Sequence, residues 1–146
     1  MITIKLSDTF EQEIITFLVN ESYRLYMKLK KAKLEEVTKN QQNSLKMQLK
    51  NMYMNDINHF KIYTVFDDNL MIGCATLSSD GYLRDLYVTE EYQNKGIGSL
   101  LIQRIIEDVK EQSEITLNTY YELLEFYKKN GFSVLKEFDT SIMMKR

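Results

Sequence analysis

Apolar and polar residues alternate at the start of the chain and then change to a helical spacing. Ile2, Ile4 and Leu6 are separated by polar residues, which predicts a short strand with one buried face. The next apolar positions recur every three or four residues and predict an amphipathic helix. Its apolar stripe consists of Phe10, Ile14, Phe17, Leu18 and Leu25.

The segment of residues 28–55 is polar and permissive for helix formation. Leu45, Leu49 and Met52 keep the i, i+4, i+7 spacing of a second helix. Residues 28–43 are interpreted as a helix extension or as a mobile, solvated connection. Their basic cluster is followed at once by two glutamates and has no interleaved aromatic residues, which favours a solvated face over a nucleic-acid contact.

A different pattern begins at residue 60. Three short runs rich in β-branched and aromatic residues, separated by turn-forming residues, predict a hairpin-connected meander at residues 60–66, 71–78 and 82–88. A third helix is predicted from the spacing of Leu100, Leu101, Ile105, Ile106 and Val109. A strand, a fourth helix and a terminal antiparallel pair follow at residues 114–119, 120–130, 132–138 and 140–146. The predicted order is β, α, α, β, β, β, α, β, α, β, β.

Composition and charge narrow the functional classes. A chain of 146 residues that is 44% apolar and 27% charged fits one soluble globular domain. The formal net charge of -2 gives no overall attraction to nucleic acid or to an anionic membrane, so neither is expected as a partner. The chain has no long apolar run and no basic start followed by an apolar stretch. We therefore expect a cytoplasmic protein.

Cysteine and histidine each occur once, as Cys74 and His59. One of each cannot assemble a Cys/His zinc site, and a lone cysteine cannot form an intrachain disulfide. We interpret His59 as a loop side chain and Cys74 as a small buried hydrophobic residue. A Ser-His-Asp relay could be built only around His59. The sequence predicts no metal site.

Two glycines follow the predicted strand that ends at Val88 and precede an apolar helix. A strand that enters a helix through such a turn presents unpaired N–H groups at the positive end of the helix dipole, which suits phosphate. Gly96 and Gly98 would permit close approach. The spacing does not fit a P-loop, because Lys95 precedes Gly96, or a dinucleotide fingerprint, because Leu101 replaces its third glycine. A plain tight turn is the alternative.

Two blocks of sequence resemble a known family. LYVTEEYQNKGIGSLL, residues 86–101, is similar to the pattern L-x-V-x-x-x-x-[QR]-x-x-G-x-G of the GNAT superfamily of acetyl-CoA-dependent N-acetyltransferases. LLEFYKKNGF, residues 123–132, resembles a second segment of that family. The order of predicted elements also fits, so the resemblance covers residues 1–146 as one domain. It implies an α/β (α+β) fold with a mixed, mostly antiparallel central sheet of about seven strands, flanked by about four helices.

The resemblance implies acetyl-CoA as the cofactor, without a metal. In that family the glycine turn cradles the pyrophosphate of coenzyme A, and the backbone of the preceding strand pairs with the pantetheine arm. The residues that fall on the turn are Gln93, Asn94, Lys95, Gly96, Ile97, Gly98 and Ser99, and those on the strand are Leu86, Tyr87 and Val88. Tyr120 stands where many members have an asparagine that contacts the cofactor, and Asn118 is the candidate to replace it.

Tyr127 falls on the tyrosine that protonates the departing thiolate in many family members. A phenol with a pKa near 10 is protonated at neutral pH and can donate as the thiolate forms. A packed aromatic residue is the alternative. Asp85 matches an aspartate of the diamine acetyltransferase branch, and Arg84 occupies the place of that branch's proposed base. Asp85, or a water relay, is our candidate to accept the ammonium proton, with a structural ion pair as the alternative.

The resemblance implies direct attack by a neutral primary amine on the thioester. In this fold the first two helices form one wall of the acceptor pocket, so Tyr23, Tyr26 and Met27 are the candidate substrate contacts. The motifs leave open whether the acceptor is a small molecule or a peptide, and whether the protein is a monomer or a homodimer. A catalytically silent acyl-CoA-binding regulatory module and an interaction domain are the alternative functions.

Overall fold

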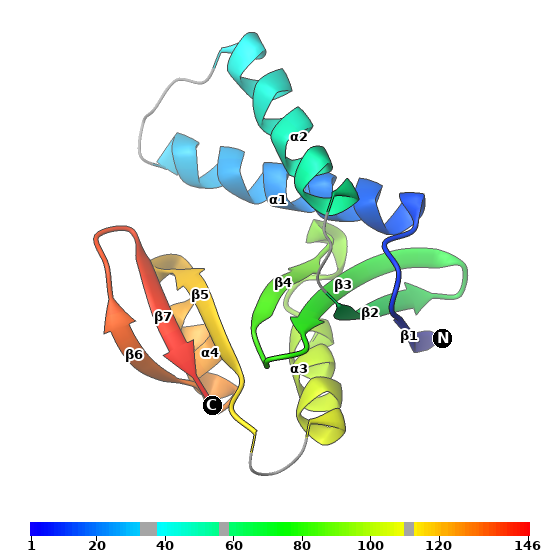
Figure 1. Cartoon of the computed structure of the whole chain (residues 1–146), viewed down its shortest axis with the longest axis vertical. Helices are drawn as coiled ribbons and strands as arrows, with labels where there is room; N and C mark the ends of the chain where they lie inside the picture. The colour runs from blue at the N-terminus through cyan, green and yellow to red at the C-terminus, as the bar shows by residue number, and fades with distance from the viewer. Residues whose placement is uncertain (33–37, 56–58, 110–112) are drawn as a thin grey trace.

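The structure is a computed structural model that describes residues 1–32, 38–55, 59–109 and 113–146. These residues form seven strands and four α-helices in the predicted order, with two short 3-10 turns (Figure 1). The strands are β1 (Ile2–Ser7), β2 (Phe60–Asp67), β3 (Leu70–Ser78), β4 (Leu83–Val88), β5 (Thr116–Tyr120), β6 (Ser133–Glu137) and β7 (Ser141–Lys145). The helices are α1 (Gln12–Ala32), α2 (Lys39–Met54), α3 (Ile97–Asp108) and α4 (Leu124–Lys129), and the 3-10 turns are η1 (Glu90–Tyr92) and η2 (Tyr121–Leu123). The mixed α+β fold is confirmed.

The strands divide into two antiparallel sheets, with the orders β1-β2-β3-β4 and β5-β7-β6. Strand β4 is the edge of the first sheet, and β5 is the edge of the second. They meet at one parallel bridge between Tyr82 and Thr116, next to a 3.0 Å hydrogen bond from the Thr116 N–H to the Gly81 carbonyl. Beyond that bridge no ladder joins the described parts of β4 and β5, and the strands diverge (Figure 1).

A bulge in β4 explains why the two sheets separate. The register with β3 passes from Thr76 opposite Asp85 to Leu77 opposite Leu83, so Arg84 is an extra residue. A bulge bends its strand and increases the local twist, which turns β4 away from β5. It also re-aims side chains, and the Arg84 Nε lies 3.1 Å from the Asp85 Oδ2 even though the two residues are neighbours in the strand.

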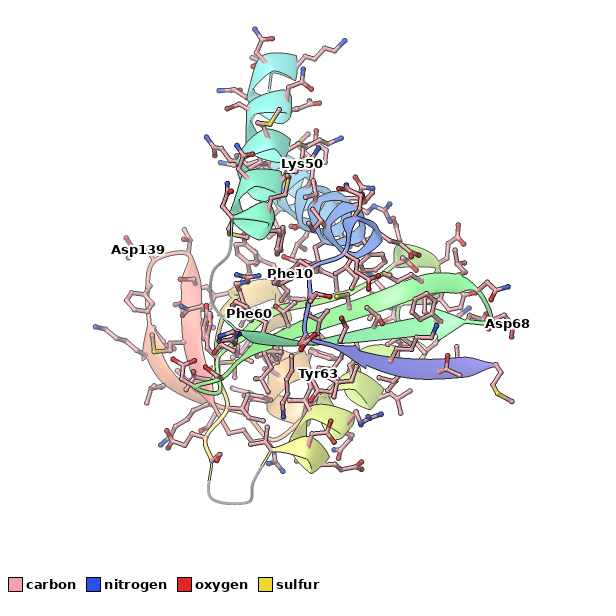
Figure 2. The ribbon with its side chains drawn as sticks, turned by 45° about the vertical axis from the view of Figure 1, so that its right-hand side comes forward. Phe10, Lys50, Phe60, Tyr63, Asp68 and Asp139 are labelled. Atoms are coloured by element: carbon pink, nitrogen blue, oxygen red, sulfur yellow. The ribbon has the colours of Figure 1, made fainter. Side chains whose placement is uncertain are left out.

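Helices cover both faces of the four-stranded sheet. Tyr53 of α2 packs with the buried stripe of α1 on one face, where Phe10 and Phe60 lie between the helices and the sheet (Figure 2). Cys74 is buried in this cluster, as expected. The other face packs against α3, α4 and the second sheet in a larger core. His59 lies exposed in the loop before β2, also as expected.

The predicted extension or solvated connection over residues 28–43 is divided in the structure. Its first part continues α1, which ends at Ala32. Residues 33–37 lie outside the described residues. The last part opens α2, where the Thr38 Oγ1 accepts from the Gln41 N–H at 3.2 Å and the Gln41 Oε1 accepts from the Thr38 N–H at 2.8 Å. This capping box fixes the start of the helix.

Candidate functional site

The turn before α3 leaves a helix end open. Gly96 is the N-cap of α3 and has a φ of 83°, a left-handed conformation that favours glycine. No side chain caps this helix, so the N–H groups of its first turn lack a partner within the helix. A Cβ added at Gly96 would meet no atom within 4 Å. Free space therefore adjoins a set of N–H groups at the positive end of the helix dipole, which suits an anion.

Gly98 is explained by packing. A Cβ added there would lie 2.9 Å from the Phe126 Cζ, so the missing side chain lets α3 pack closely against α4. The Phe126 ring in turn meets the Tyr127 ring edge-to-face, with 5.1 Å between centroids. Gly98 thus brings the turn next to the helix that carries Tyr127. The sequence predicted ligand approach at both glycines, with a plain tight turn as the alternative, and gave no indication of this packing role.

Gln93 and Lys95 make contacts within the protein. The Gln93 Nε2 donates a 2.9 Å hydrogen bond to the Val88 carbonyl, which braces the turn against the end of β4. The Lys95 Nζ lies 5.3 Å from the centroid of the Tyr92 ring, whose hydroxyl donates to Asp67 at 2.7 Å. Both side chains therefore support the shape of the turn. Asn94 also belongs to this turn and takes a positive φ of 62°.

The edges of β4 and β5 form the two sides of the divided sheet. Leu86, Tyr87 and Val88 pair with β3 on one side, and no described strand pairs with their other side. On that side no described strand competes with a ligand for their backbone groups, although the Val88 carbonyl already accepts from the Gln93 Nε2. Asn118 pairs with Met143 of β7 and exposes its side chain from β5. The structure thus places Asn118 on the strand that faces this part of β4.

Tyr127 is a buried aromatic residue with an unengaged hydroxyl. Its side chain packs edge-to-face against Phe126 and Phe132, and the residue is 7% exposed. Among the described residues the hydroxyl has no hydrogen-bond partner, yet it is not sealed from solvent. Burial raises the pKa of Tyr127, and the nearby Tyr87 and Asp85 raise this pKa further. The phenol is therefore protonated at neutral pH and can donate.

Asp85 is held by three donors. The Tyr53 hydroxyl donates to its carboxylate at 2.7 Å, the Thr76 hydroxyl at 2.6 Å and the Arg84 Nε at 3.1 Å. The Arg84 guanidinium also lies over the Phe60 ring, 4.1 Å from its centroid. Burial raises the pKa of Tyr53, and the neighbouring Asp85 raises this pKa further, so Tyr53 remains a donor. This arrangement favours the structural ion pair over a freely available base.

Glu21 is a buried carboxylate that was not predicted from the sequence. This residue of α1 is 6% exposed and stands three residues after Leu18, on the buried stripe of the helix. Among the described residues its ion-pair partner is Arg24, whose Nη1 lies 3.5 Å from the Glu21 Oε1. Burial raises the pKa of Glu21, Arg24 lowers it and Glu90 raises it. The signal in the sequence was a carboxylate at a position where the helical spacing requires burial.

The predicted acceptor contacts lie along α1 and are half-buried. The Lys46 Nζ of α2 is 4.4 Å from the centroid of the Tyr23 ring, so Tyr23 contacts the second helix. The Lys30 Nζ is 5.4 Å from the centroid of the Tyr26 ring. No described contact brings Tyr23, Tyr26 or Met27 to the edge of β4. Two other α1 residues affect Tyr87 of β4: Ser22 lowers the pKa of Tyr87, and Glu21 raises it.

Other parts of the surface fit a ligand site less well. Two hollows of about 470 and 370 Å³ are lined only by α1, α2 and the segment before α1, away from the turn and α4. Within the described ranges, no three His, Cys, Asp or Glu side chains lie close enough together to hold a metal ion. No described helix is both long and apolar enough to cross a membrane.

Comparisons with known proteins identify the family. The acetyltransferase (GNAT) domain model matches residues 28–139. A protein assigned to that family from Desulfovibrio desulfuricans has a TM-score of 0.68 and 14% identity, over 99% of this chain and 98% of its own. A chimera of the spermidine N-acetyltransferase SpeG from Vibrio cholerae has a TM-score of 0.61 and 18% identity, over 97% of this chain and 93% of its own.

A Bacillus anthracis protein described as a streptothricin acetyltransferase was solved in complex with acetyl coenzyme A. It has a TM-score of 0.52 and 26% identity, over 65% of each chain. Curated proteins give no significant match to the sequence. The family match covers most of the chain and includes the glycine turn and Tyr127. The chain therefore belongs to the GNAT family of acetyltransferases, which gives acetyl transfer as its general class of activity.

Proposed function

We propose that this protein is an N-acetyltransferase that moves an acetyl group from acetyl-CoA to a primary amine by direct attack. The observation that carries the proposal is the pairing of an open α3 N-terminus with a protonated, unengaged Tyr127 hydroxyl on the adjacent helix. Gly98 packs these two elements together through Phe126. An interaction domain has no need of either feature.

The residues of the turn fit a pyrophosphate. The uncapped N–H groups of Ile97, Gly98 and Ser99 would hold its oxygens, because anions are stabilised at a helix N-terminus. The space over Gly96 leaves room for the approach. Gln93, Asn94 and Lys95 would keep the turn in shape, and Lys95 would add positive charge.

The free edge of β4 fits an extended arm with amide groups. Leu86, Tyr87 and Val88 would pair with the pantetheine arm through their backbone, as a strand pairs with its neighbour. Asn118 would contact the arm from the opposite edge. The related Bacillus anthracis structure contains acetyl coenzyme A, which supports this choice of cofactor. When bound, acetyl-CoA supplies an acetyl group activated as a thioester.

Tyr127 would act as the proton donor to the leaving thiolate. Its raised pKa keeps the phenol protonated, and its hydroxyl has no competing partner among the described residues. Backbone N–H groups at the β4 edge would stabilise the negative charge that develops on the thioester oxygen. Holding the amine and the thioester together supplies much of the rate, so no nucleophilic cysteine is needed.

Asp85 would position these groups. Its bonds to Tyr53, Thr76 and Arg84 join α2 and β3 to the bulge of β4 and fix the strand edge next to Tyr127. Tyr23, Tyr26 and Met27 remain proposed contacts for the acceptor on the α1 side. Their half-buried aromatic and thioether surfaces would accept the carbon chain of an amine rather than its charge.

The test combines binding with turnover. Acetyl-CoA at about a hundred times its dissociation constant should stabilise the protein by roughly 2.7 kcal/mol, whereas ATP and NAD should not. Thiol release is then followed with 1,4-diaminobutane, lysine amide, phenylethylamine and a lysine-containing peptide, and the acetylated product is identified by mass. Stabilisation without turnover would indicate a catalytically silent module. No stabilisation would overturn the proposal.

A further inference from the structure

Glu21 is a buried carboxylate whose oxygens accept no hydrogen bond from the described residues. Its ion pair with Arg24 spans 3.5 Å, which is longer than a charged hydrogen bond, and the Arg24 side chain is 51% exposed. Only 7% of the Glu21 side chain is exposed, yet its oxygens are not among the atoms sealed from solvent. The lone pairs of this carboxylate are therefore available to a group that enters from solvent.

The charged and titratable groups around Glu21 define where it faces. Arg24 comes from the same helix, Glu90 from η1 and Tyr87 from β4. Tyr87 packs against the cluster that α1 forms on the sheet. Helix α1, which carries Glu21, lies against β4, whose outer edge has no described partner strand (Figure 1).

Tyr87 also connects this carboxylate to the proposed proton donor. It raises the pKa of Tyr127, and Glu21 raises the pKa of Tyr87. Tyr87 of β4 is thus within electrostatic range of both Glu21 of α1 and Tyr127 of α4. A reacting centre beside Tyr87 would lie within the same range of both groups.

The Asp85 carboxylate, unlike that of Glu21, accepts hydrogen bonds from described residues. Three donors, from Tyr53, Thr76 and Arg84, already occupy its carboxylate. A carboxylate offers about four lone-pair sites, and these three donors already fill most of them. Glu21 can take a proton without breaking a hydrogen bond to any described residue.

We propose that Glu21 is the catalytic base that takes the ammonium proton of the acceptor, an inference that rests on the proposed N-acetyltransferase function. The acceptor arrives as R–NH3⁺, and Glu21 accepts one proton, which frees the nitrogen lone pair. The C–N bond forms as the C–S bond breaks. Tyr127 gives its proton to the thiolate and is reprotonated by the second proton lost from nitrogen. The amide keeps one N–H, and Glu21 releases its proton to solvent.

The environment of Glu21 suits this role. Burial disfavours the charged form and raises the pKa of Glu21, and Glu90 acts in the same direction, while Arg24 opposes them. A carboxyl with a raised pKa accepts a proton more readily than an ordinary glutamate. Two neighbouring carboxylates also favour a cationic amine over a neutral acceptor.

The test uses the full chain with acetyl-CoA and three named acceptors: 1,4-diaminobutane, lysine amide and phenylethylamine. Glu21→Gln keeps the size of the side chain, and Glu13→Gln, an exposed change on the same helix, is the matched control. The Glu21 carboxyl is also titrated directly by NMR in the wild-type protein, which needs no acceptor. Acetyl-CoA binding is measured separately by calorimetry for each variant.

We expect Glu21→Gln to lower kcat by about 100-fold or more, with acetyl-CoA affinity unchanged. The wild-type kcat should rise with pH through the Glu21 pKa and level off, whereas the variant should keep rising toward the pKa of the amine. Glu13→Gln should behave as wild type. Two results would overturn this inference but not the proposed function. One is a Glu21→Gln variant with the pH profile and kcat of the wild type, and the other is a Glu21 pKa at or below its ordinary value. Acetyl-CoA binding without acetylation of any acceptor by the wild type would overturn the proposed function and this inference with it.

Discussion

Tyr53 of α2 donates a 2.7 Å hydrogen bond to Asp85 of β4, and both residues are buried. The bond joins the helical pair to the strand that borders the division between the two sheets. Thr76 of β3 donates to the other carboxylate oxygen, so the bulge in β4 is held from two elements. The shape of the β4 edge therefore depends on how α2 packs against the sheet. The proposed site depends on that edge.

Replacing Tyr53 by Phe should destabilise the protein. The change leaves a buried carboxylate oxygen without its donor, at a cost of about 1–3 kcal/mol in the free energy of unfolding. Urea denaturation of both proteins measures it. Tyr26→Phe is the matched control, because the Tyr26 hydroxyl has no hydrogen bond to a described residue. Equal stability of Tyr53→Phe and the wild type would contradict the role given to this bond.

Replacing either glycine of the turn by alanine should destabilise the protein, but for different reasons. Gly98→Ala forces a Cβ against the Phe126 ring and should cost about 1–3 kcal/mol through overpacking. Gly96→Ala meets no atom but must keep a φ of 83°, at about 1–2 kcal/mol. Adding Phe126→Leu should relieve the first cost and leave the second unchanged, as a double-mutant cycle would reveal. Equal relief of both costs would rule out this distinction.

Stability should depend on pH through Glu21. Its pKa is raised in the folded state, so between its ordinary pKa and the raised pKa the folded protein binds more protons than the unfolded chain. Stability therefore falls as pH rises through this window. Glu21→Gln does not titrate, so its stability relative to the wild type should increase over the same window and then stay constant. Thermal unfolding across the pH range measures this, and a parallel pH dependence of the two proteins would contradict it.

Tyr127→Phe should remove activity without loss of stability. The hydroxyl has no hydrogen bond to a described residue, so its removal leaves no partner unsatisfied. Loss of the proton donor should lower kcat by about 100-fold or more, with acetyl-CoA binding retained. Steady-state thiol release and calorimetry together measure both effects. Unchanged turnover would remove Tyr127 from the mechanism.

The order of elements and the position of the turn could be predicted from the sequence because both depend on local patterns. Alternation and helical spacing gave the strands and helices, and the glycines gave the opening of α3. The bulge at Arg84 could not be predicted in this way. It depends on how β4 pairs with β3, and that pairing is a property of two strands rather than of one.

The details of the site also required tertiary contacts. Position 98 requires a glycine because the ring of Phe126, which belongs to another helix, occupies the space that a Cβ would need. Glu21 stands between Leu18 and Leu25 at helical spacing, so the stripe itself indicates that it is buried. It was missed because glutamate is usually found at the surface, and only the structure gives a reason to read it otherwise.

The most direct test of the account is an amide NMR titration of the labelled protein with acetyl-CoA. We predict that the largest shifts fall on Gly96, Ile97, Gly98 and Ser99 at the start of α3 and on Leu86 to Val88 at the edge of β4. ATP and NAD should leave these signals in place. Shifts confined to the hollows over α1 and α2, or none at saturating acetyl-CoA, would contradict the assignment of the cofactor to this turn.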